Sequence, residues 1–497
     1  MADQQKRLDT WTRVAGKRAL PTREEGRRAF AAVAPDRIPR YVKVNKAWMV
    51  MMVRQGIVPA DRGRTILAAL DAVDLDEMIE TYDERFDKPI LQLERYLSDK
   101  AGAHASDVMA GRTLPPPVYR MALREKIVPL IAAGLDLRGT LLDHAARHTG
   151  AVMPGYTHLS HAQPMTYGHY LLGIHDAVAR ALRQIEGAYD STNRCDMGCG
   201  ALAGTSFDID RPLLADLLGF DGLIEHSNDC VAATDFAVDL GAAVINLLIP
   251  LTRSADEMDT WTTFEMDMLE ISDAIGATSS MMPQKKNATI CEHLRWRLGV
   301  VLGCFTEITT GAHATPYGDV MEVMFVPKTA ERIAEHGAWA CRRMAVLVEN
   351  MTAKPDVMLR HAREGFSTVS ELANVLFRER GTPWRVAHAI VAGVVRRLVD
   401  AGQTACDITT YLVDEVAAAV TGEPAGLTAD QIAAAIDPVT FVEAHDSQGG
   451  VAPKETDRMI AARRDDLAAD RERHDRRLAA LDDADRRLDD AVAELTA

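Results

Sequence analysis

The feature that most restricts the fold of this chain is a series of long segments in which apolar residues recur three and four positions apart. These segments cover residues 167–193, 229–258, 290–308 and 321–348. Each is apolar on more than one side, so a single layer of helices facing water cannot accommodate them. We therefore predict a mostly α-helical fold built on a central bundle of long helices, which other subunits complete.

Composition and length agree with this prediction. Aromatic residues are only 5% of the 497 residues, and strands depend on aromatic and β-branched side chains, so we expect few strands. The length far exceeds what one compact core needs. We expect an N-terminal helical domain over 1–118, the long-helix bundle over 119–360, and a small helical domain with a charged helical tail over 361–497.

Prolines and glycines mark the expected breaks. We expect residues 1–40 to form an arm with short helical pieces, and the proline-rich stretch 111–117 to form a rigid loop. Residues 229–258 should be one helix that Pro250 kinks, with Asn228 or Asp229 as its N-cap. The alternating charges of 463–497 are typical of a solvated amphipathic helix, with partner binding as the alternative.

Charge and cysteine usage exclude several classes of protein. The net charge of −16 opposes binding to phosphate backbones, so nucleic acid is not an expected partner. The first residues, Met1 to Arg18, are polar and do not resemble a signal peptide. The sequence has no evident run of about 18 apolar residues, so we expect a cytoplasmic protein without a membrane span. The seven cysteines are scattered; Cys195 and Cys199 lack a second pair for a zinc site, so we expect reduced, buried thiols.

The loop over residues 274–287 carries the first candidate chemistry. It places the hydroxyls of Ser279 and Ser280 close to the ammonium groups of Lys285 and Lys286 and the amide of Asn287. Elimination beside a carboxylate needs a base for a weakly acidic C–H and cations or amides for the dianionic intermediate. Serine can act as that base where cations and N–H groups favour its alkoxide. Alone, such a loop is more typical of a flexible surface segment.

A second cluster, residues 155–164, shifts the balance towards a reactive site. Thr157 and His158 precede the helix expected from Tyr167, so we place them near a helix N-terminus, which binds anions. A histidine there can protonate a leaving amine if a carboxylate orients it, and Glu292 is the candidate. A metal pair of His158 and His161 is the alternative, but no third ligand has suitable spacing. No Gly-x-Ser-x-Gly elbow supports a serine hydrolase, and no phosphate or dinucleotide loop is present.

Several motifs in order resemble one known family. The loop motif is similar to the Gly-Ser-Ser-x-Met-Pro-x-Lys-x-Asn pattern of the fumarase/aspartase superfamily. Other segments resemble argininosuccinate lyase in particular; they are Gln284-Lys285-Lys286-Asn287, Gly155-Tyr156-Thr157-His158-Leu159, Gly200-Ala201-Leu202-Ala203-Gly204-Thr205 with Ile209-Asp210-Arg211, Arg385-Val386-Ala387-His388, and Gly449-Gly450-Val451-Ala452-Pro453. The resemblance runs from about Tyr41 to Pro453.

The resemblance implies a helical homotetramer with active sites shared between subunits, a small dicarboxylate-containing substrate, fumarate or an analogue as product, and neither cofactor nor metal. By analogy, Ser279 is the base, Lys285 and Asn287 hold the aci-carboxylate, and Thr157 binds a carboxylate. His158 with Glu292 then assists the leaving group. The further substrate-binding candidates are Ser280, Lys286, Arg112, Thr113, Asn45, Gln92 and Tyr317.

The pocket walls depart from the family pattern. Where argininosuccinate lyases read Gly-Arg-Ser-Arg-Asn-Asp, this chain reads Gly111-Arg112-Thr113-Leu114-Pro115-Pro116. Each polar side chain that no longer pairs with a guanidinium-bearing substrate should cost a few kcal/mol of binding free energy. We therefore expect carbon–nitrogen bond cleavage in another N-substituted aspartate or succinyl adduct, and Trp48, Leu114 and Met321 suggest a less polar leaving group. The alternatives are a genuine argininosuccinate lyase and a non-catalytic structural homologue.

Overall fold

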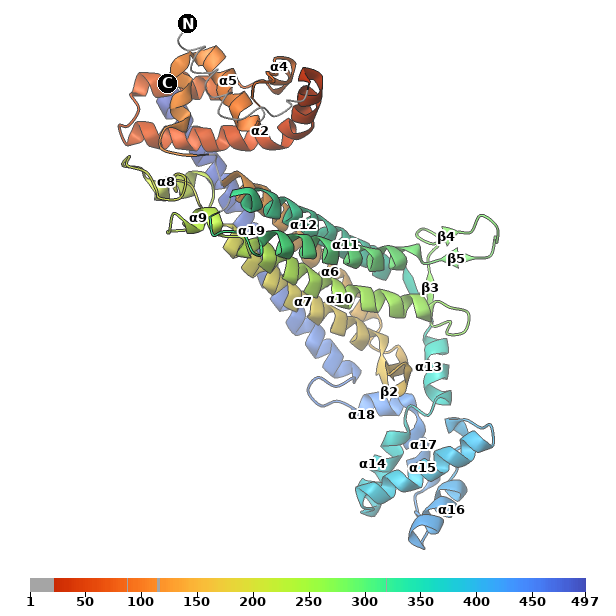
Figure 1. The fold of residues 1–497 in the computed structure, drawn as a ribbon. Helices are drawn as coiled ribbons and strands as arrows, with labels where there is room; N and C mark the ends of the chain where they lie inside the picture. Colours follow the sequence, from red (N-terminus) through yellow and green to blue (C-terminus); the bar gives the residue numbers. More distant parts are fainter. Residues whose placement is uncertain (1–21, 87, 114–116, 319) are drawn as a thin grey trace.

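The computed structural model describes residues 22–86, 88–113, 117–318 and 320–497, and helices dominate it (Figure 1). The fold is mostly α-helical, as predicted. Leu114 and the Met321 side chain lie outside the described part, so their expected influence on the leaving group stays a prediction.

The N-terminal body is built around one long buried helix. Its elements are α2 (Arg23–Arg54), α3 (Ala60–Asp71), α4 (Leu75–Glu80), α5 (Pro89–Ala101) and the 3₁₀ helix η1 (Ala103–Met109). The core centres on Trp48 and the four residues that follow it, all fully buried. The side chain of Thr22 accepts a hydrogen bond from the Glu25 N–H and so begins α2.

The expected short helical pieces are wrong for residues 23–40, because α2 runs through Pro35 and Pro39 without a break, whereas residues 1–21 of the expected arm lie outside the described residues. A proline inside a helix removes one hydrogen bond and crowds the carbonyl four residues earlier. Both prolines are exposed, while Ala34 and Ile38 on the other face are buried in the core. Burial of that face therefore outweighs the local cost.

The bundle consists of five long helices that lie side by side along one axis (Figure 1). They are α6 (Pro117–Arg147), α7 (Tyr167–Thr192), α10 (Asp235–Trp261), α11 (Thr289–Ala312) and α12 (Val320–Glu349). The four predicted segments thus form helices close to their expected bounds. The centre is α10, which packs against α7, α11 and α12.

Two expectations about the segment 229–258 need correction. It is not one helix, because α9 (Asp229–Ala232) ends where Ala233 turns extended, and α10 starts afresh after Thr234. Asn228 forms no side-chain cap bond. By length and composition alone, α10 resembles a membrane-spanning helix. More than half of its apolar stretch is buried inside the molecule, as expected for the core helix of a bundle.

Three short two-stranded sheets lie at the end of the bundle away from the N-terminal body (Figure 1). β1 (Val152–Thr157) pairs with β2 (Ser160–Thr166), β3 (Leu269–Ile271) with β6 (Met351–Ala353), and β4 (Ala277–Thr278) with β5 (Lys286–Asn287), all antiparallel. A further short helix, α8 (Arg211–Leu217), lies at the opposite end.

The C-terminal body has a small core of its own around Leu372, Leu376 and Val394. Its elements are α13 (Pro355–Glu364), α14 (Val369–Arg380), α15 (Trp384–Asp400), η2 (Ala405–Asp407), α16 (Thr410–Thr421), α17 (Ala429–Ile436) and α18 (Pro438–Ala444).

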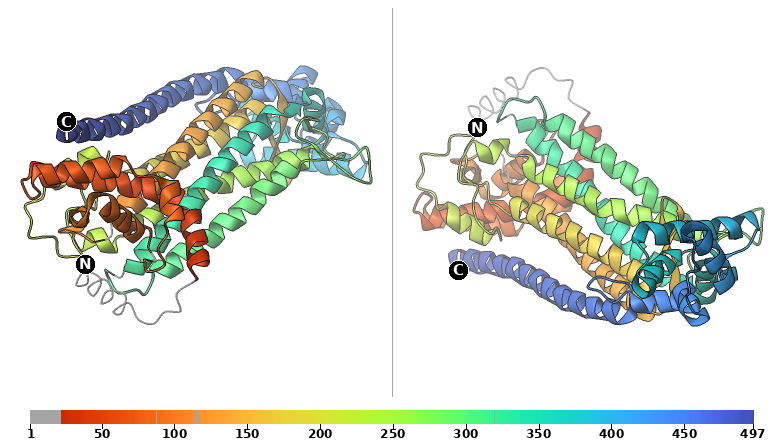
Figure 2. Two further views of the ribbon diagram at one scale, coloured as in Figure 1. Left: turned by 90° about the horizontal axis from the view of Figure 1, so that it is seen from above. Right: turned by 90° about the horizontal axis from the view of Figure 1, so that it is seen from below.

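The last helix, α19 (Pro453–Thr496), links all three parts of the chain. At 1.5 Å per residue its 44 residues span about 66 Å, and it follows the bundle back to the N-terminal body (Figure 2). It packs on α6, α2, α3 and α8, and Leu467, Leu488 and Val492 are buried. Ion pairs tie it to α7, α8 and α2; they are Arg463–Asp176, Arg487–Asp216 and Arg54–Glu494. The predicted amphipathic helix is therefore confirmed: its apolar face packs on the rest of the molecule, and most of its charged residues are exposed.

Candidate active site

The loop containing Ser279 is held at its base by a hairpin. Ala277 pairs with Asn287 and Thr278 with Lys286, so the chain leaves and returns at one point. The Ser279 Oγ accepts hydrogen bonds from the backbone N–H groups of Met281, at 3.3 Å, and Met282, at 3.0 Å. Two donors aimed at this oxygen favour its alkoxide form. The serine is thereby placed in a setting that suits a base.

Some of the other polar side chains of the loop hydrogen-bond to neighbouring segments, and others are exposed at its surface. The Lys286 ammonium donates to the Ile271 carbonyl at 3.1 Å and pairs with Asp273 at 2.6 Å, which raises the lysine pKa. The Asn287 amide donates to the Ala277 carbonyl at 3.2 Å. Lys285 and Ser280 are exposed at the loop surface. Lys286 therefore holds the loop base, whereas Lys285 is available for a ligand.

Thr157 and His158 do not lie near a helix N-terminus, and the sequence prediction was wrong on this point. They are at the tip of the β1–β2 hairpin, where Thr157 pairs with Ser160. The helix start is instead capped by Thr166, which pairs with Val152 at the base of the hairpin. Six residues of extended strand separate base from tip by about 20 Å.

The hairpin tip has a strained backbone. His158 and Leu159 have φ angles of 55° and 61°, the left-handed region that glycine or asparagine normally occupies in such a two-residue turn. Leu159 is 96% exposed, so no packing explains its presence. Strain of this kind persists most often where function requires it, so the tip is a candidate ligand contact.

Glu292 does not contact His158 within one chain. It is exposed in the first turn of α11, and among the described residues no hydrogen bond or ion pair joins it to the imidazole. The predicted orientation of His158 by Glu292 is therefore absent from the single chain.

The remaining candidates lie at the other end of the bundle. Arg112 donates a hydrogen bond to the Asn45 side-chain oxygen and stacks over the Trp48 ring at 5.6 Å. Within the described part of the chain its Nε and Nη1 are buried without hydrogen-bond partners, as are Asn45 Nδ2 and Trp48 Nε1. Burial lowers the pKa of Arg112 to about 9. Thr113 is exposed beside this cluster of unpaired donors.

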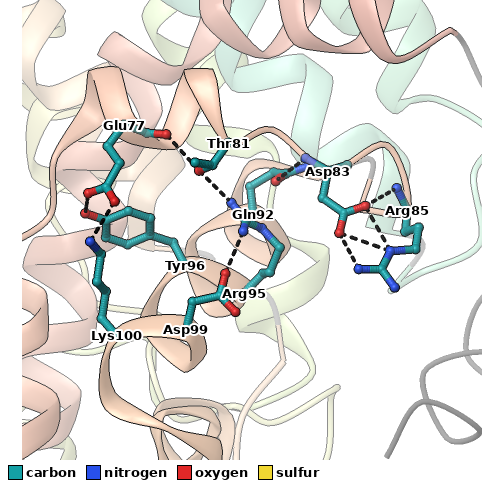
Figure 3. Close-up of polar contacts among 9 residues, drawn as sticks. All are labelled: Glu77, Thr81, Asp83, Arg85, Gln92, Arg95, Tyr96, Asp99 and Lys100. Carbon is teal, nitrogen blue, oxygen red and sulfur yellow. Dashed lines mark hydrogen bonds and ion pairs between the residues drawn. The ribbon is translucent and has the colours of Figure 1, made fainter.

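Gln92 has a role in holding a turn. Figure 3 shows its amide among the side chains of the α4–α5 region. The amide nitrogen donates to the carbonyls of Asp83 and Phe86, both at 2.6 Å, and the side chain is 1% exposed. Since both amide hydrogens are in use, we assign Gln92 to positioning rather than to substrate contact.

Tyr317 closes a cavity between the start of α10 and the loop after α11. Its hydroxyl donates to Asp229 at 2.7 Å, which raises the tyrosine pKa. The cavity is about 330 Å³ and is also lined by Asp235 and Thr315. Sequence reasoning assigned Asp229 only to helix capping, because no local signal links it to a tyrosine 88 residues away.

One chain does not bring the two groups of candidates together. The 24 residues of α11 separate Asn287 from Tyr317 by about 36 Å, and the 31 residues of α6 separate Thr113 from Thr157 by about 46 Å. Figure 1 shows the serine loop and the β1–β2 hairpin at one end of the bundle and α9 at the other.

Comparisons with known proteins match most of the chain. The family described as "Lyase" matches residues 116–303, and the family "Argininosuccinate lyase C-terminal" matches 366–443. The argininosuccinate lyase of Methanosarcina acetivorans is 34% identical over 433 residues, covering 86% of this chain and 87% of the relative. That of Methanoculleus marisnigri is 35% identical over 444 residues, with coverage of 86% and 87%.

Solved structures show the same fold. EDDS lyase in complex with formate has a TM-score of 0.87 and 30% identity, and the match covers 97% of each chain. A class II fumarase from Schistosoma mansoni has a TM-score of 0.64 at 14% identity, covering 82% of this chain and 90% of the fumarase, which indicates the fold alone.

Proposed function

The chain belongs to the argininosuccinate lyase family of the fumarase/aspartase superfamily and is a carbon–nitrogen lyase, and we propose that it eliminates an amine from an N-substituted aspartate to leave fumarate or a close analogue. The observation that carries this proposal is the pair of N–H donors on the Ser279 Oγ, which equips that oxygen as a base. A solved structure of an EDDS lyase variant with bound fumarate, which matches this chain with a TM-score of 0.87 at 30% identity, supports fumarate as the product.

The proposed reaction starts at the carbon beside a carboxylate. Ser279 removes a proton there, and the adjacent carboxylate takes up the charge as an aci-carboxylate. Lys285 and the second N–H of the Asn287 side-chain amide, whose first N–H donates to the Ala277 carbonyl, lie on the same loop and would hold that dianion. The carbon–nitrogen bond then breaks, and His158 delivers a proton to the departing amine while Thr157 holds the second carboxylate.

We propose that the site is completed by other copies of the chain in a homotetramer. The separation of about 36 Å along α11 is too large for one substrate to touch both groups of candidates. Apolar side chains on the outer face of the bundle support such an assembly, because Trp296 is 63%, Leu302 44% and Ile249 41% exposed. In this arrangement a second copy supplies the Tyr317 end, and Glu292 reaches a His158 from another chain.

We propose a substrate other than argininosuccinate. The support for this proposal is the segment 111–116, where Thr113, Leu114 and two prolines replace the polar residues of the argininosuccinate lyase pattern, which removes side chains able to bind a guanidinium-bearing substrate. Genuine argininosuccinate lyase activity is the second candidate, favoured by 34% identity over 86% of the chain to a protein of that name. The intact Ser279, Lys285 and His158 argue against a non-catalytic homologue.

The test is a panel of N-substituted aspartates that includes argininosuccinate, with fumarate followed by its ultraviolet absorbance. The reverse reaction would be run with fumarate and a matching series of amines. Turnover of at least one member faster than argininosuccinate supports the proposal. Turnover of argininosuccinate alone would establish the second candidate, and no fumarate from any member would refute both.

A further inference from the structure

Two thiols form a small buried cluster outside the main cores. Cys199, in the glycine-rich loop before α8, and Cys230, in α9, are each 2% exposed and pack together with Val231. They are 31 positions apart in the sequence, so the fold and not a local motif brings them together. The mechanism proposed above uses neither.

The surroundings of the pair make the two sulfurs unequal. The Arg211 guanidinium lies 3.5 Å from the Cys230 Sγ and is fixed by the carbonyls of Met197, Ile224 and Glu225. The Cys199 thiol donates to the Gly200 carbonyl at 3.4 Å and the Cys230 thiol to the Ile224 carbonyl at 3.3 Å. The contact between the two thiols, helped by the Arg211 charge, lowers the pKa of Cys230 and raises that of Cys199. A thiolate beside a guanidinium is the usual setting of a reactive cysteine.

The other cysteines lack this arrangement. Cys195 is fully buried in the N-terminal core, and burial raises its pKa to about 12. Cys291, Cys304 and Cys341 lie within the bundle core. Cys406 is exposed but stands in the distant C-terminal body. Leu202 and Phe207, in the loop that follows Cys199, are 48% and 41% exposed.

We propose that Cys230 and Cys199 are an oxidation site at which a hydroperoxide forms a disulfide that restrains the substrate pocket. The Cys230 thiolate attacks the peroxide; a sulfur–oxygen bond forms, the oxygen–oxygen bond breaks, and an alcohol or water leaves after taking a proton. The Cys199 sulfur then displaces that oxygen from Cys230, forming the disulfide and releasing water with the Cys199 proton. The two thiols lose two electrons, which the peroxide gains.

The disulfide would act on the cavity beside Tyr317 and on the segment that contains Arg112, and this step rests on the proposed function. Cys230 follows Asp229, whose carboxylate accepts the Tyr317 hydroxyl and lines the cavity of about 330 Å³. Cys199 opens the loop whose Thr205 and Phe207 pack on Gly111, the residue before Arg112. Drawing the sulfurs to bonding distance, about 2.05 Å, shifts both segments. Oxidation should therefore lower turnover, and a reducing agent should restore it.

The test treats the full-length protein with hydrogen peroxide and counts free thiols, with peptide mapping of the product. The expected result is loss of two thiols and one linked peptide pair containing Cys199 and Cys230. Cys199→Ser and Cys230→Ser should each abolish the linkage, while Cys195→Ser and Cys406→Ser should keep it. Oxidation of Cys406 alone, or a disulfide through Cys195, would overturn the assignment.

Activity provides a separate readout with the substrate identified by the panel. The oxidised protein should lose most of its turnover, dithiothreitol should restore it, and Cys230→Ser should keep its activity through the same treatment. A disulfide that forms without changing turnover would contradict the proposed restraint. If no member of the panel is a substrate, the proposed function is refuted. The peptide mapping still tests the disulfide, because it does not depend on activity.

Discussion

The backbone N–H of Met282 lies 3.0 Å from the side-chain oxygen of Ser279, and the N–H of Met281 lies 3.3 Å from the same atom. The two N–H groups occupy the acceptor sites of the hydroxyl oxygen and stabilise the negative charge that appears there when the proton leaves. This relationship connects the loop geometry to elimination chemistry.

Replacing this oxygen should remove the base without disturbing the fold. Ser279→Ala is expected to lower kcat by about 10² to 10⁴-fold, the usual contribution of a positioned base, with little change in Tm. Ser272→Ala, in the neighbouring turn, is the matched control and should retain activity, since its hydroxyl only accepts from the Ala274 N–H. Equal losses in the two variants would point to a structural role for Ser279.

The shared site predicts rescue between two inactive variants. Ser279→Ala and Tyr317→Ala damage opposite ends of the bundle, and Tyr317 is 69% exposed, so its loss should not affect folding. Each variant alone should be nearly inactive, whereas assemblies formed by co-expression should regain part of the activity because some sites draw both native residues from different copies. The absence of any regain in mixed assemblies of confirmed composition would argue that each chain works alone.

The strained hairpin tip predicts an unusual response to glycine. Leu159 has a φ of 61° and no buried surface, so Leu159→Gly relieves strain of about 1 kcal/mol that roughly offsets the entropy glycine adds to the unfolded chain. Its Tm should match or exceed that of the native protein. Leu202→Gly, at an exposed position without positive φ, should lower stability by about 0.5–1 kcal/mol in the same chemical unfolding experiment.

A buried histidine predicts a loss of stability in mild acid. Burial lowers the pKa of His144 to about 4, compared with 6.5 when unfolded. Below pH 6.5 the unfolded chain binds a proton that the folded chain does not, so the free energy of unfolding falls as pH drops towards 4. The contribution is at most about 3 kcal/mol. His144→Gln should flatten the profile between pH 6.5 and 4 in urea titrations; an unchanged slope would contradict the assigned pKa.

The parts of the structure that sequence could predict are those with a repeating signal. The long helices α7, α10, α11 and α12 have apolar periods over many turns, so their positions followed from the sequence alone. The hairpin at Thr157 and His158 carries no alternating pattern, and its prolines and glycine suggested only a turn. Helix α2 shows the converse, since burial of Ala34 and Ile38 overrides two prolines that locally indicate a break.

The candidate site was predictable in its chemistry but not in its geometry. Ser279, Lys285 and Asn287 are adjacent in sequence, so their common loop was evident. The distance between Asn287 and Tyr317 depends on the length and direction of α11 in the bundle. The hydrogen-bond partners of Gln92 depend on a turn that the sequence does not specify. Contacts made by folding, such as Cys199 with Cys230, leave no spacing pattern to detect.

The most direct measurement of the proposed elimination is its reverse in deuterated water. Fumarate and the amine half of the best substrate in the panel would be incubated with the protein, and the product examined by proton NMR. Addition catalysed through Ser279 predicts an N-substituted aspartate with a single deuterium on the methylene carbon, at one stereochemical position, and none of this product with Ser279→Ala. Product lacking that deuterium, or formed equally well by Ser279→Ala, would contradict the assignment of Ser279 as the base.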